Sequence, residues 1–151
     1  MEIERICGDA AGSIFEDMSA LDKSCFGNDG WSAKAFSDEA NQPGGIVLAA
    51  FVGGEFAGLF AGFTAGDTGE VLTVATVPDF RGRGVARALM TEFFSLVPQE
   101  VETIALEVRQ SNAPAIALYR SFGFEKAGVR KRFYKDPTED ADIMVCRLDR
   151  K

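Results

Sequence analysis

The residues best suited to chemistry form a glycine- and arginine-rich segment, residues 81–86, with the sequence Arg-Gly-Arg-Gly-Val-Ala. An apolar run precedes it and an amphipathic pattern follows, so its backbone N–H groups and a positive helix end should face one edge of a sheet, where anions bind. Glycines at 82 and 84 lack the Cβ atoms that would hold a phosphate away, and arginines at 81, 83 and 87 add positive charge. The segment predicts a diphosphate site. Two alternatives remain, a plain strand-to-helix turn and an RNA-binding Arg-Gly tail, and the position between strand and helix disfavours the tail.

A carboxylate is expected near the same edge. Ile104, Leu106 and Val108 share one face of a predicted strand, which leaves Glu107 on the other face near the carboxyl end of that strand. A carboxylate in a cleft can act as a general base. The alternative is a salt bridge with a nearby arginine such as Arg109, and the residues alone do not decide between the two.

Composition excludes several kinds of chemistry. The 151 residues include no histidine, the commonest metal ligand and the usual partner of a catalytic serine or cysteine, so metal and triad chemistry are not expected. Cys146 lies in an apolar stretch and is predicted to be buried, and the same default is assigned to Cys7 and Cys25. A net charge of -7 argues against nucleic acid and suits a cationic partner.

The length favours a single domain over residues 1–151 with a real core. No apolar run is long enough to span a bilayer, so no membrane association is expected. The acidic start of the chain lacks the pattern of a secretory signal, which predicts a cytoplasmic protein.

Periodicity predicts an α/β architecture with a sheet of mixed direction. Helices are expected from residue 13, with Ser13 and Glu16 as a capping box, and from residue 33, with Ser32 as N-cap. Gly53-Gly54 should turn a hairpin between the runs 46–52 and 56–63. The rest predicts, in order, a strand covered on both faces (71–77), a helix (84–97), a strand (102–108), a helix closed by Gly123 (112–122) and two strands (124–133 and 141–148).

Two stretches resemble a known family. Residues 81–86 after a strand ending in Val77-Pro78 look like the acyl-CoA pyrophosphate loop of the GNAT superfamily. Residues 106–109 and 111–119, followed by Phe-Gly-Phe at 122–124, are similar to the stretch that marks the RimI group, the ribosomal-protein-alanine N-acetyltransferases. The sequence Arg-Phe-Tyr at 132–134 and residues 139–141 fit the same group, so the similarity is dense over residues 70–145.

The resemblance implies a GNAT fold, a mostly antiparallel sheet with one splayed parallel strand pair and helices on both faces. It also implies transfer of an acetyl group from acetyl-CoA to the N-terminal amine of a protein, a ribosomal protein that begins with alanine. By the same resemblance Glu107 is the general base, acting through water, and Tyr119 is the general acid. The implied cofactor-binding residues lie in the strand, the loop and the following turn: Val74, Ala75, Thr76, Gly82, Arg83, Gly84, Val85, Ala86, Arg87 and Asn112.

Spacing and chemistry bear on these implied roles. Tyr119 follows Asn112 by two helical turns and shares its face, so it points to the same site, although it could also be a core aromatic. A phenol with a pKa of about 10 suits a thiolate of comparable basicity. Lysine side chains, polyamines and other small amines are alternative acceptors, and a non-catalytic acyl-CoA sensor is an alternative of another class.

The acceptor side matches the family more loosely. The loop at 26–32 ends in Trp31-Ser32 as the family pattern does, but it lacks the usual proline and carries more glycine. Trp31 and Tyr134 are the candidates to line the acceptor pocket, with simple packing as the alternative for each. Asp29 is interpreted as a solvated loop charge, with contact to the acceptor amine as the alternative.

Overall fold

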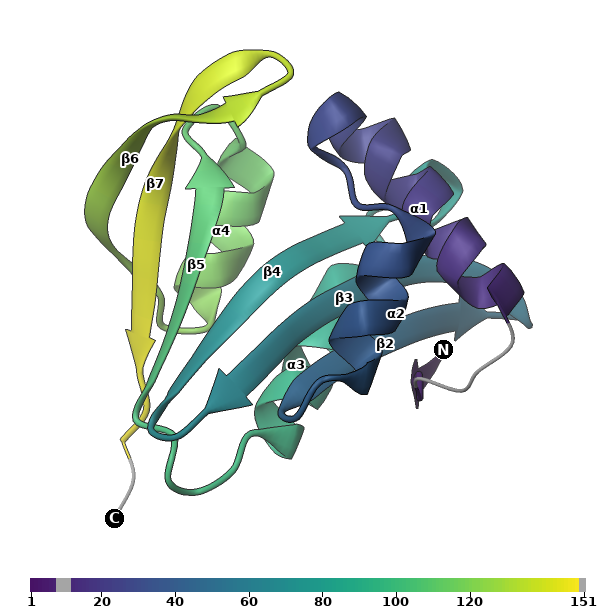
Figure 1. The fold of residues 1–151 in the computed structure, drawn as a ribbon, viewed down its shortest axis with the longest axis horizontal. Coiled ribbons are helices and arrows are strands. Elements are labelled where there is room, and N and C mark those ends of the chain that lie inside the picture. The colour runs from purple at the N-terminus through teal and green to yellow at the C-terminus, as the bar shows by residue number, and fades with distance from the viewer. Residues whose placement is uncertain (8–11, 150–151) are drawn as a thin grey trace.

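A seven-stranded sheet organises the computed structural model, which describes residues 1–7 and 12–149. The strand order is β1-β2-β3-β4-β5-β7-β6. Helices α1 and α2 cover one face, and α3 and α4 cover the other (Figure 1). The strands are β1 (Glu2–Arg5), β2 (Gly45–Val52), β3 (Glu55–Ala65), β4 (Thr68–Thr76), β5 (Thr103–Arg109), β6 (Glu125–Lys135) and β7 (Thr138–Arg147). The helices are α1 (Gly12–Phe26), α2 (Ala33–Asn41), α3 (Val85–Leu96) and α4 (Ala113–Ser121), with 3-10 turns η1 (Gly27–Asp29) and η2 (Pro78–Phe80). The predicted mixed α/β fold is confirmed.

Each face of the sheet has its own core. The stripe predicted for α3, at positions 85, 89, 93 and 97, is buried against one face. Met18 of α1 and Phe36 of α2 are fully buried against the other face. Because a buried side chain of this size contributes about 1.5–3 kcal/mol, these contacts fix the helices firmly to the sheet.

The only parallel neighbours within the sheet are β4 and β5, and they separate part-way along. Residues 68–71 pair with residues 103–106, and beyond that point β4 pairs only with β3 and β5 only with β7. Figure 1 shows β4 running toward α1 while β5 runs away from it, beside β7 and α4. The predicted splayed pair is confirmed.

A bulge lies where the strands separate. Ala61 of β3 pairs with Thr73, whereas the next residue, Gly62, pairs with Val71, so Leu72 has no partner in β3. The extra residue changes the alternation of side chains along β4. Val71 therefore belongs to the α3 side, and Thr73 faces α1.

Local capping and turn signals were predicted correctly in most places. The Ser32 hydroxyl accepts the backbone N–H of Ala35 (3.1 Å) at the start of α2. The Asn112 carbonyl oxygen accepts the N–H of Ala115 (3.2 Å) at the start of α4. Gly53 and Gly54 have φ of +58° and +82°, as the predicted hairpin turn requires.

Several expectations were wrong. Strand β1 was not predicted, because four mostly exposed residues at a sheet edge carry little apolar pattern. Ser13 lies inside α1 rather than capping it. Cys146 is buried as predicted, but Cys7 is exposed and Cys25 is partly exposed. Strand β4 is covered on both faces as predicted, with Val71 in the core on the α3 side and Ala75 in the core on the α1 side, although every second residue along it is only half-buried.

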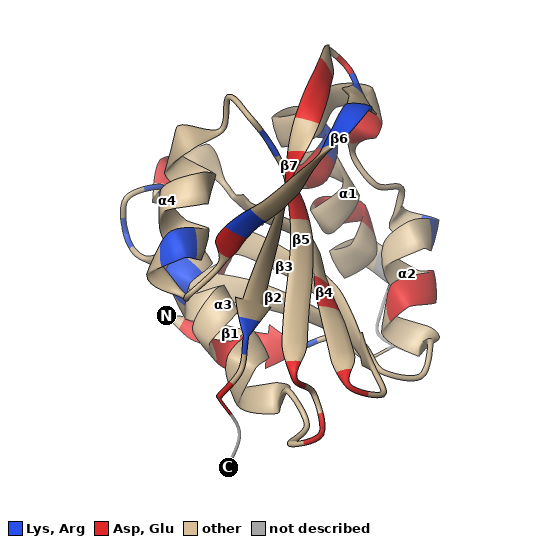
Figure 2. Ribbon diagram, turned by 90° about the vertical axis from the view of Figure 1, so that its left-hand side faces the viewer, with Lys and Arg blue, Asp and Glu red and all other residues tan. Residues whose placement is uncertain are grey.

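The edge strand β6 is rich in basic residues (Figure 2). Its pairing with β7 is interrupted between Arg130 and Tyr134, where Arg132 adopts a φ of +52°. Exposed lysines and arginines on an edge strand discourage pairing with other chains. The interruption also separates the outer part of the β6–β7 hairpin, which borders the site, from the regular ladder.

Candidate functional site

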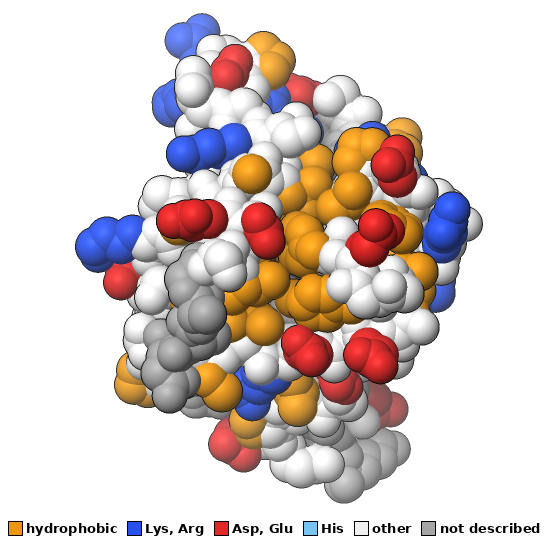
Figure 3. All heavy atoms as spheres, turned by 90° about the vertical axis from the view of Figure 1, so that its right-hand side faces the viewer, with side chains coloured by type: hydrophobic (Ala, Val, Ile, Leu, Met, Phe, Trp, Pro, Cys, Tyr) orange, Lys and Arg blue, Asp and Glu red, His pale blue; other side chains and the backbone are white. Residues whose placement is uncertain are grey.

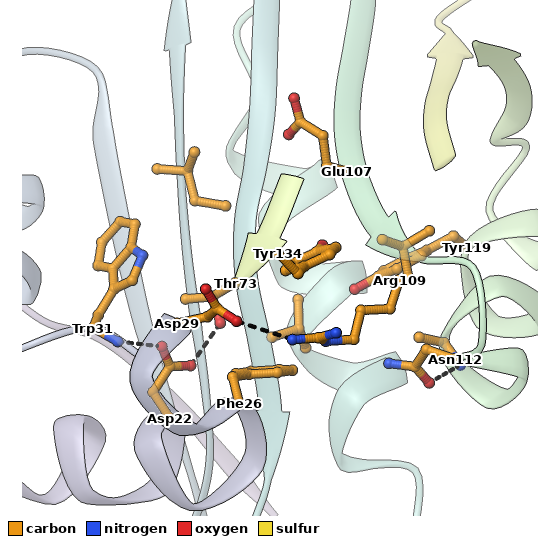
Figure 4. Close-up of a pocket in the computed structure, with 14 residues that line it drawn as sticks. Asp22, Phe26, Asp29, Trp31, Thr73, Glu107, Arg109, Asn112, Tyr119 and Tyr134 are labelled. Carbon is orange, nitrogen blue, oxygen red and sulfur yellow. Dashed lines mark hydrogen bonds and ion pairs between the residues drawn. The ribbon is translucent and has the colours of Figure 1, made fainter. Parts of the chain in front are cut away.

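Two cavities meet in the cleft between the splayed strands. A groove of about 830 Å³ runs along β4 to residues 81–87, and a smaller cavity of about 100 Å³ lies between the α1–α2 loop and β6. Val74, Asn112 and Tyr119 line both. Residues far apart in the sequence are thus gathered at one place, as Figure 4 shows for the smaller cavity.

The glycine-rich loop has the geometry of an anion site. Gly82 and Gly84 have φ of +78° and +80°, and a Cβ built on either would meet no atom within 4 Å. Gly84 caps α3 without a side chain, so the first N–H groups of the helix keep their capacity to bind an anion. This geometry fits the predicted diphosphate.

The arginines of this loop have different surroundings. Arg81 and Arg87 line the groove together with Gly82, Gly84, Val85 and Ala86. Arg83 instead lies over the ring of Phe80, with its guanidinium carbon 5.4 Å from the ring centroid, and it does not line the groove. The structure therefore gives no support to a direct role for the Arg83 side chain.

The strand segment predicted to bind the cofactor also borders the groove. Val74, Ala75 and Thr76 line it, and no strand lies beside them on the side that β5 has left. Their outward backbone groups can pair with amides of an extended ligand. Asn112 uses its carbonyl oxygen to cap α4, which leaves its amide nitrogen as a donor toward the groove.

Glu107 has an arginine partner and lines the smaller cavity as well. It is the first β5 residue beyond the parallel pairing with β4. The Arg130 Nε donates to its Oε1 at 3.0 Å, so the partner comes from β6 and is not the expected Arg109. The salt bridge and the position at the cleft, which the sequence presented as alternatives, are both present.

Tyr119 is almost completely buried, with 7 % of its surface exposed. Its ring packs edge-on against Phe124 at 5.9 Å, yet it borders both cavities. Burial raises the pKa of its hydroxyl well above the ordinary value of 10. This hydroxyl therefore holds its proton more tightly than the ordinary phenol assumed from the sequence.

Trp31 and Tyr134 both line the smaller cavity, as predicted. The Trp31 ring also packs on Phe36 at 5.1 Å. The Tyr134 ring lies 4.4 Å from the guanidinium carbon of Arg109, and burial raises the pKa of Tyr134 to about 12. Each aromatic residue thus combines packing with a position on the cavity wall.

Arg109 joins the two loops that border the smaller cavity, which the sequence did not predict. Its guanidinium donates to Asp29 Oδ2 at 2.9 Å and to Glu139 Oε1 at 3.1 Å. It also donates to the carbonyl oxygens of Asp136 and Pro137, both at 2.8 Å. Asp29 additionally accepts the N–H groups of Lys135 and Asp136, so it is not a solvated loop charge.

The sequence also missed Asp22 of α1, which lines the smaller cavity with only 1 % of its surface exposed. Its Oδ2 accepts the Trp31 N–H at 2.8 Å, and its Oδ1 accepts the Thr73 hydroxyl at 2.6 Å. Burial raises the pKa of this carboxyl. One signal was present, since Asp22 falls four residues after Met18 and seven after Phe15 on the apolar side of the helix.

Neither a metal cluster nor a membrane span is found in the described ranges. No group of three or more His, Cys, Asp or Glu side chains there is placed to hold a metal ion. None of the helices there is long and apolar enough to cross a bilayer.

Fold and site together define an acyl-CoA-dependent transferase, and comparison with known proteins gives the family. A sequence model described as "Acetyltransferase (GNAT) family" matches residues 15–124. The chain belongs to the GNAT family of acetyltransferases and is an acyltransferase. The resemblance found in the sequence is confirmed.

The similar proteins include named N-acetyltransferases. The chain is 37 % identical to the N-alpha-acetyltransferase RimI of Mycobacterium tuberculosis, over 82 % of this chain and 78 % of that protein. It is 41 % identical to the [ribosomal protein bS18]-alanine N-acetyltransferase of Escherichia coli, over 54 % of this chain and 57 % of that protein. The crystal structure of the ribosomal-protein-S18-alanine N-acetyltransferase from Escherichia coli aligns with a TM-score of 0.83 and 27 % identity, covering 99 % of this chain and 95 % of that one.

Proposed function

We propose that the protein transfers the acetyl group of acetyl-CoA to the N-terminal amine of a protein, a ribosomal protein that begins with alanine. The observation that carries the proposal is the meeting of the two cavities at Tyr119, with Glu107 on the wall of the smaller one. One cavity suits the cofactor and the other suits the acceptor; the proposed acid, Tyr119, lies where they meet, and the proposed base, Glu107, lines only the acceptor cavity. A cytoplasmic location agrees with this substrate.

The larger groove would hold acetyl-CoA. The N–H groups at the start of α3, with Arg81 and Arg87, would bind the pyrophosphate, and β4 from Val74 to Thr76 would pair with the pantetheine arm. The Asn112 amide nitrogen would donate a further hydrogen bond. Bound acetyl-CoA supplies a thioester carbonyl that an amine can attack.

Glu107 and Tyr119 would move the two protons of the reaction. The Glu107 carboxylate takes a proton from the attacking amine, directly or through one water. The Tyr119 hydroxyl donates its proton to the sulfur that leaves. Because burial raises the pKa of Tyr119, this hydroxyl carries its proton throughout the neutral range.

Two features favour an α-amine that follows a small side chain, and a third suits a basic peptide. An α-amine has a pKa near 8 and a lysine near 10.4, so its deprotonation at neutral pH costs roughly 3 kcal/mol less. The smaller cavity, of about 100 Å³, leaves little room for a large first residue. The net charge of -7 suits basic protein tails. On the right-hand side of the molecule as drawn in Figure 1, Figure 3 shows acidic side chains beside an apolar area, with basic side chains toward the edges.

A panel of peptides tests the proposal. Peptides beginning with Ala, Ser, Leu or Phe, and one Nα-blocked peptide with a single lysine, would be incubated with acetyl-CoA, and the initial rates of thiol release compared. We expect the highest kcat/KM for the alanine peptide and the lowest for the blocked peptide. Preference for the blocked peptide would redirect the proposal to side-chain amines, and acetyl-CoA binding without turnover on any peptide would favour a sensor.

A further inference from the structure

Asp22 links three parts of the acceptor side through one carboxylate. It lies on α1, its Oδ2 accepts the Trp31 N–H at 2.8 Å, and its Oδ1 accepts the Thr73 hydroxyl at 2.6 Å. Figure 4 shows the side chain between the loop and the strand. The Asp22 carboxylate therefore holds α1, the α1–α2 loop and β4 together.

A second contact fixes the same loop residue. Ser19, one turn earlier on α1, donates its hydroxyl to the Trp31 carbonyl oxygen at 2.7 Å. Gly30, just before Trp31, lies so close to the helix that a Cβ there would be 2.6 Å from the Cα of Lys23. Both backbone groups of Trp31 are thus bound by α1, and the loop rests directly on the helix.

Thr73, the residue of β4 that Asp22 contacts, lies beside the cleft where acetyl transfer is proposed. Thr73 follows the bulged Leu72, immediately beyond the point at which β5 leaves β4. Residues 74–76, which border the cofactor groove, come next in the strand. Asp22 therefore bridges Trp31 and the strand that borders the cofactor groove.

Packing does not explain a carboxylate at this position. A buried charge is costly unless it is paired, and no lysine or arginine among the described residues forms an ion pair with Asp22. An apolar side chain would suit this face of α1 better as packing. The two hydrogen bonds are what the carboxylate adds.

We propose that Asp22 is a positioning residue for the acceptor, which sets Trp31 against Thr73 so that the incoming amine meets the thioester at the required distance. The inference rests on the proposed function. Displacing a reacting group by about 1 Å can cost about a hundredfold in rate. Loss of the link should therefore reduce the use of the acceptor and leave cofactor binding intact.

The test compares Asp22→Ala and Asp22→Asn with wild type, and uses Asp17→Ala on the exposed side of α1 as the matched control. We expect Asp22→Ala to lower kcat/KM for an alanine-terminated peptide by about tenfold or more, with the Kd for acetyl-CoA within about twofold of wild type. Asp22→Asn keeps an oxygen that can accept the Trp31 N–H and should recover most of this loss. Asp17→Ala should behave as wild type.

Fluorescence gives a readout that does not depend on activity, because Trp31 is the only tryptophan of the chain. Asp22→Ala should shift its emission to longer wavelength and increase acrylamide quenching, with the far-UV circular dichroism unchanged. If Asp22→Ala does not fold, Thr73→Val removes the hydrogen bond at the strand end of the link and is measured in the same way.

The outcomes separate the two proposals. A wild-type kcat/KM for the peptide together with wild-type fluorescence in folded Asp22→Ala would overturn the positioning role, as would a loss confined to melting temperature. A wild-type protein that acetylates no peptide would refute the proposed function instead. In that case the fluorescence alone decides whether Asp22 positions Trp31.

Discussion

Replacing Arg109 with methionine should destabilise the protein and loosen the acceptor side. Arg109 connects the α1–α2 loop to the β6–β7 hairpin across the smaller cavity, through four hydrogen bonds of 2.8 to 3.1 Å. Its side chain is 13 % exposed, and that of its partner Asp29 is 17 % exposed. Methionine preserves much of the volume and removes every one of these bonds.

The expected size of the effect follows from the burial of this pair. Removing one partner of a buried ion pair costs about 3–5 kcal/mol, and the residual exposure of both side chains places this pair near about 3 kcal/mol. Asp29 keeps its bonds from the N–H groups of Lys135 and Asp136, which limits the loss. At about 2–4 °C per kcal/mol for a chain of this size, the melting temperature should fall by about 6–12 °C.

Thermal unfolding followed by circular dichroism measures this effect directly. The control is Lys34→Met, which breaks an ion pair whose side chains are 83 % and 63 % exposed and should change the melting temperature by no more than about 1 °C. In Arg109→Met the peptide KM should also rise while the Kd for acetyl-CoA stays unchanged. A melting temperature for Arg109→Met as close to wild type as that of Lys34→Met would refute the reasoning.

The site itself yields three further predictions. Glu107→Gln should lower kcat by about a hundredfold or more because the base is lost, with the Kd for acetyl-CoA by calorimetry nearly unchanged; equal losses in both would assign Glu107 to structure. Tyr119→Phe should also lower kcat. Because burial raises the pKa of Tyr119 above 10, ionisation of this hydroxyl should cause no loss of wild-type kcat up to pH 10. A fall in kcat with a midpoint below pH 10 that is absent in Tyr119→Phe would contradict this. Gly84 and Gly54 have similar φ values of +80° and +82°, so alanine at either position should strain the backbone by about 1–2 kcal/mol. Only Gly84→Ala should also weaken acetyl-CoA binding, by about tenfold. Equal Kd values for the two variants would show that the glycine-rich loop at residues 81–86 is not part of the cofactor site.

The features that the sequence predicted correctly depend on short-range patterns. The apolar stripe of α3 repeats every four residues, and the glycine-arginine loop precedes it directly, so both could be located without any tertiary contact. Glu107 was found in the same way, since alternation along a strand sets which face each residue occupies. These positions follow from geometry within a single element.

The features that were missed depend on contacts between distant segments. Asp29 and Arg109 are 80 residues apart, and each by itself looks like an ordinary polar residue of a loop or strand end. The partner of Glu107 proved to be Arg130 because β7 places β6 beside the cleft, which no local pattern reveals. The raised pKa of Tyr119 likewise depends on burial by several elements.

The most direct test of acetyl transfer to an α-amine uses one peptide with two competing amines. A peptide that begins with alanine and carries a single internal lysine would be incubated with acetyl-CoA and the protein, and tandem mass spectrometry would locate the acetyl group. We expect acetylation at the α-amine, at a rate that Glu107→Gln lowers by about a hundredfold or more. Acetylation at the lysine, or α-acetylation that Glu107→Gln leaves unchanged, would contradict it.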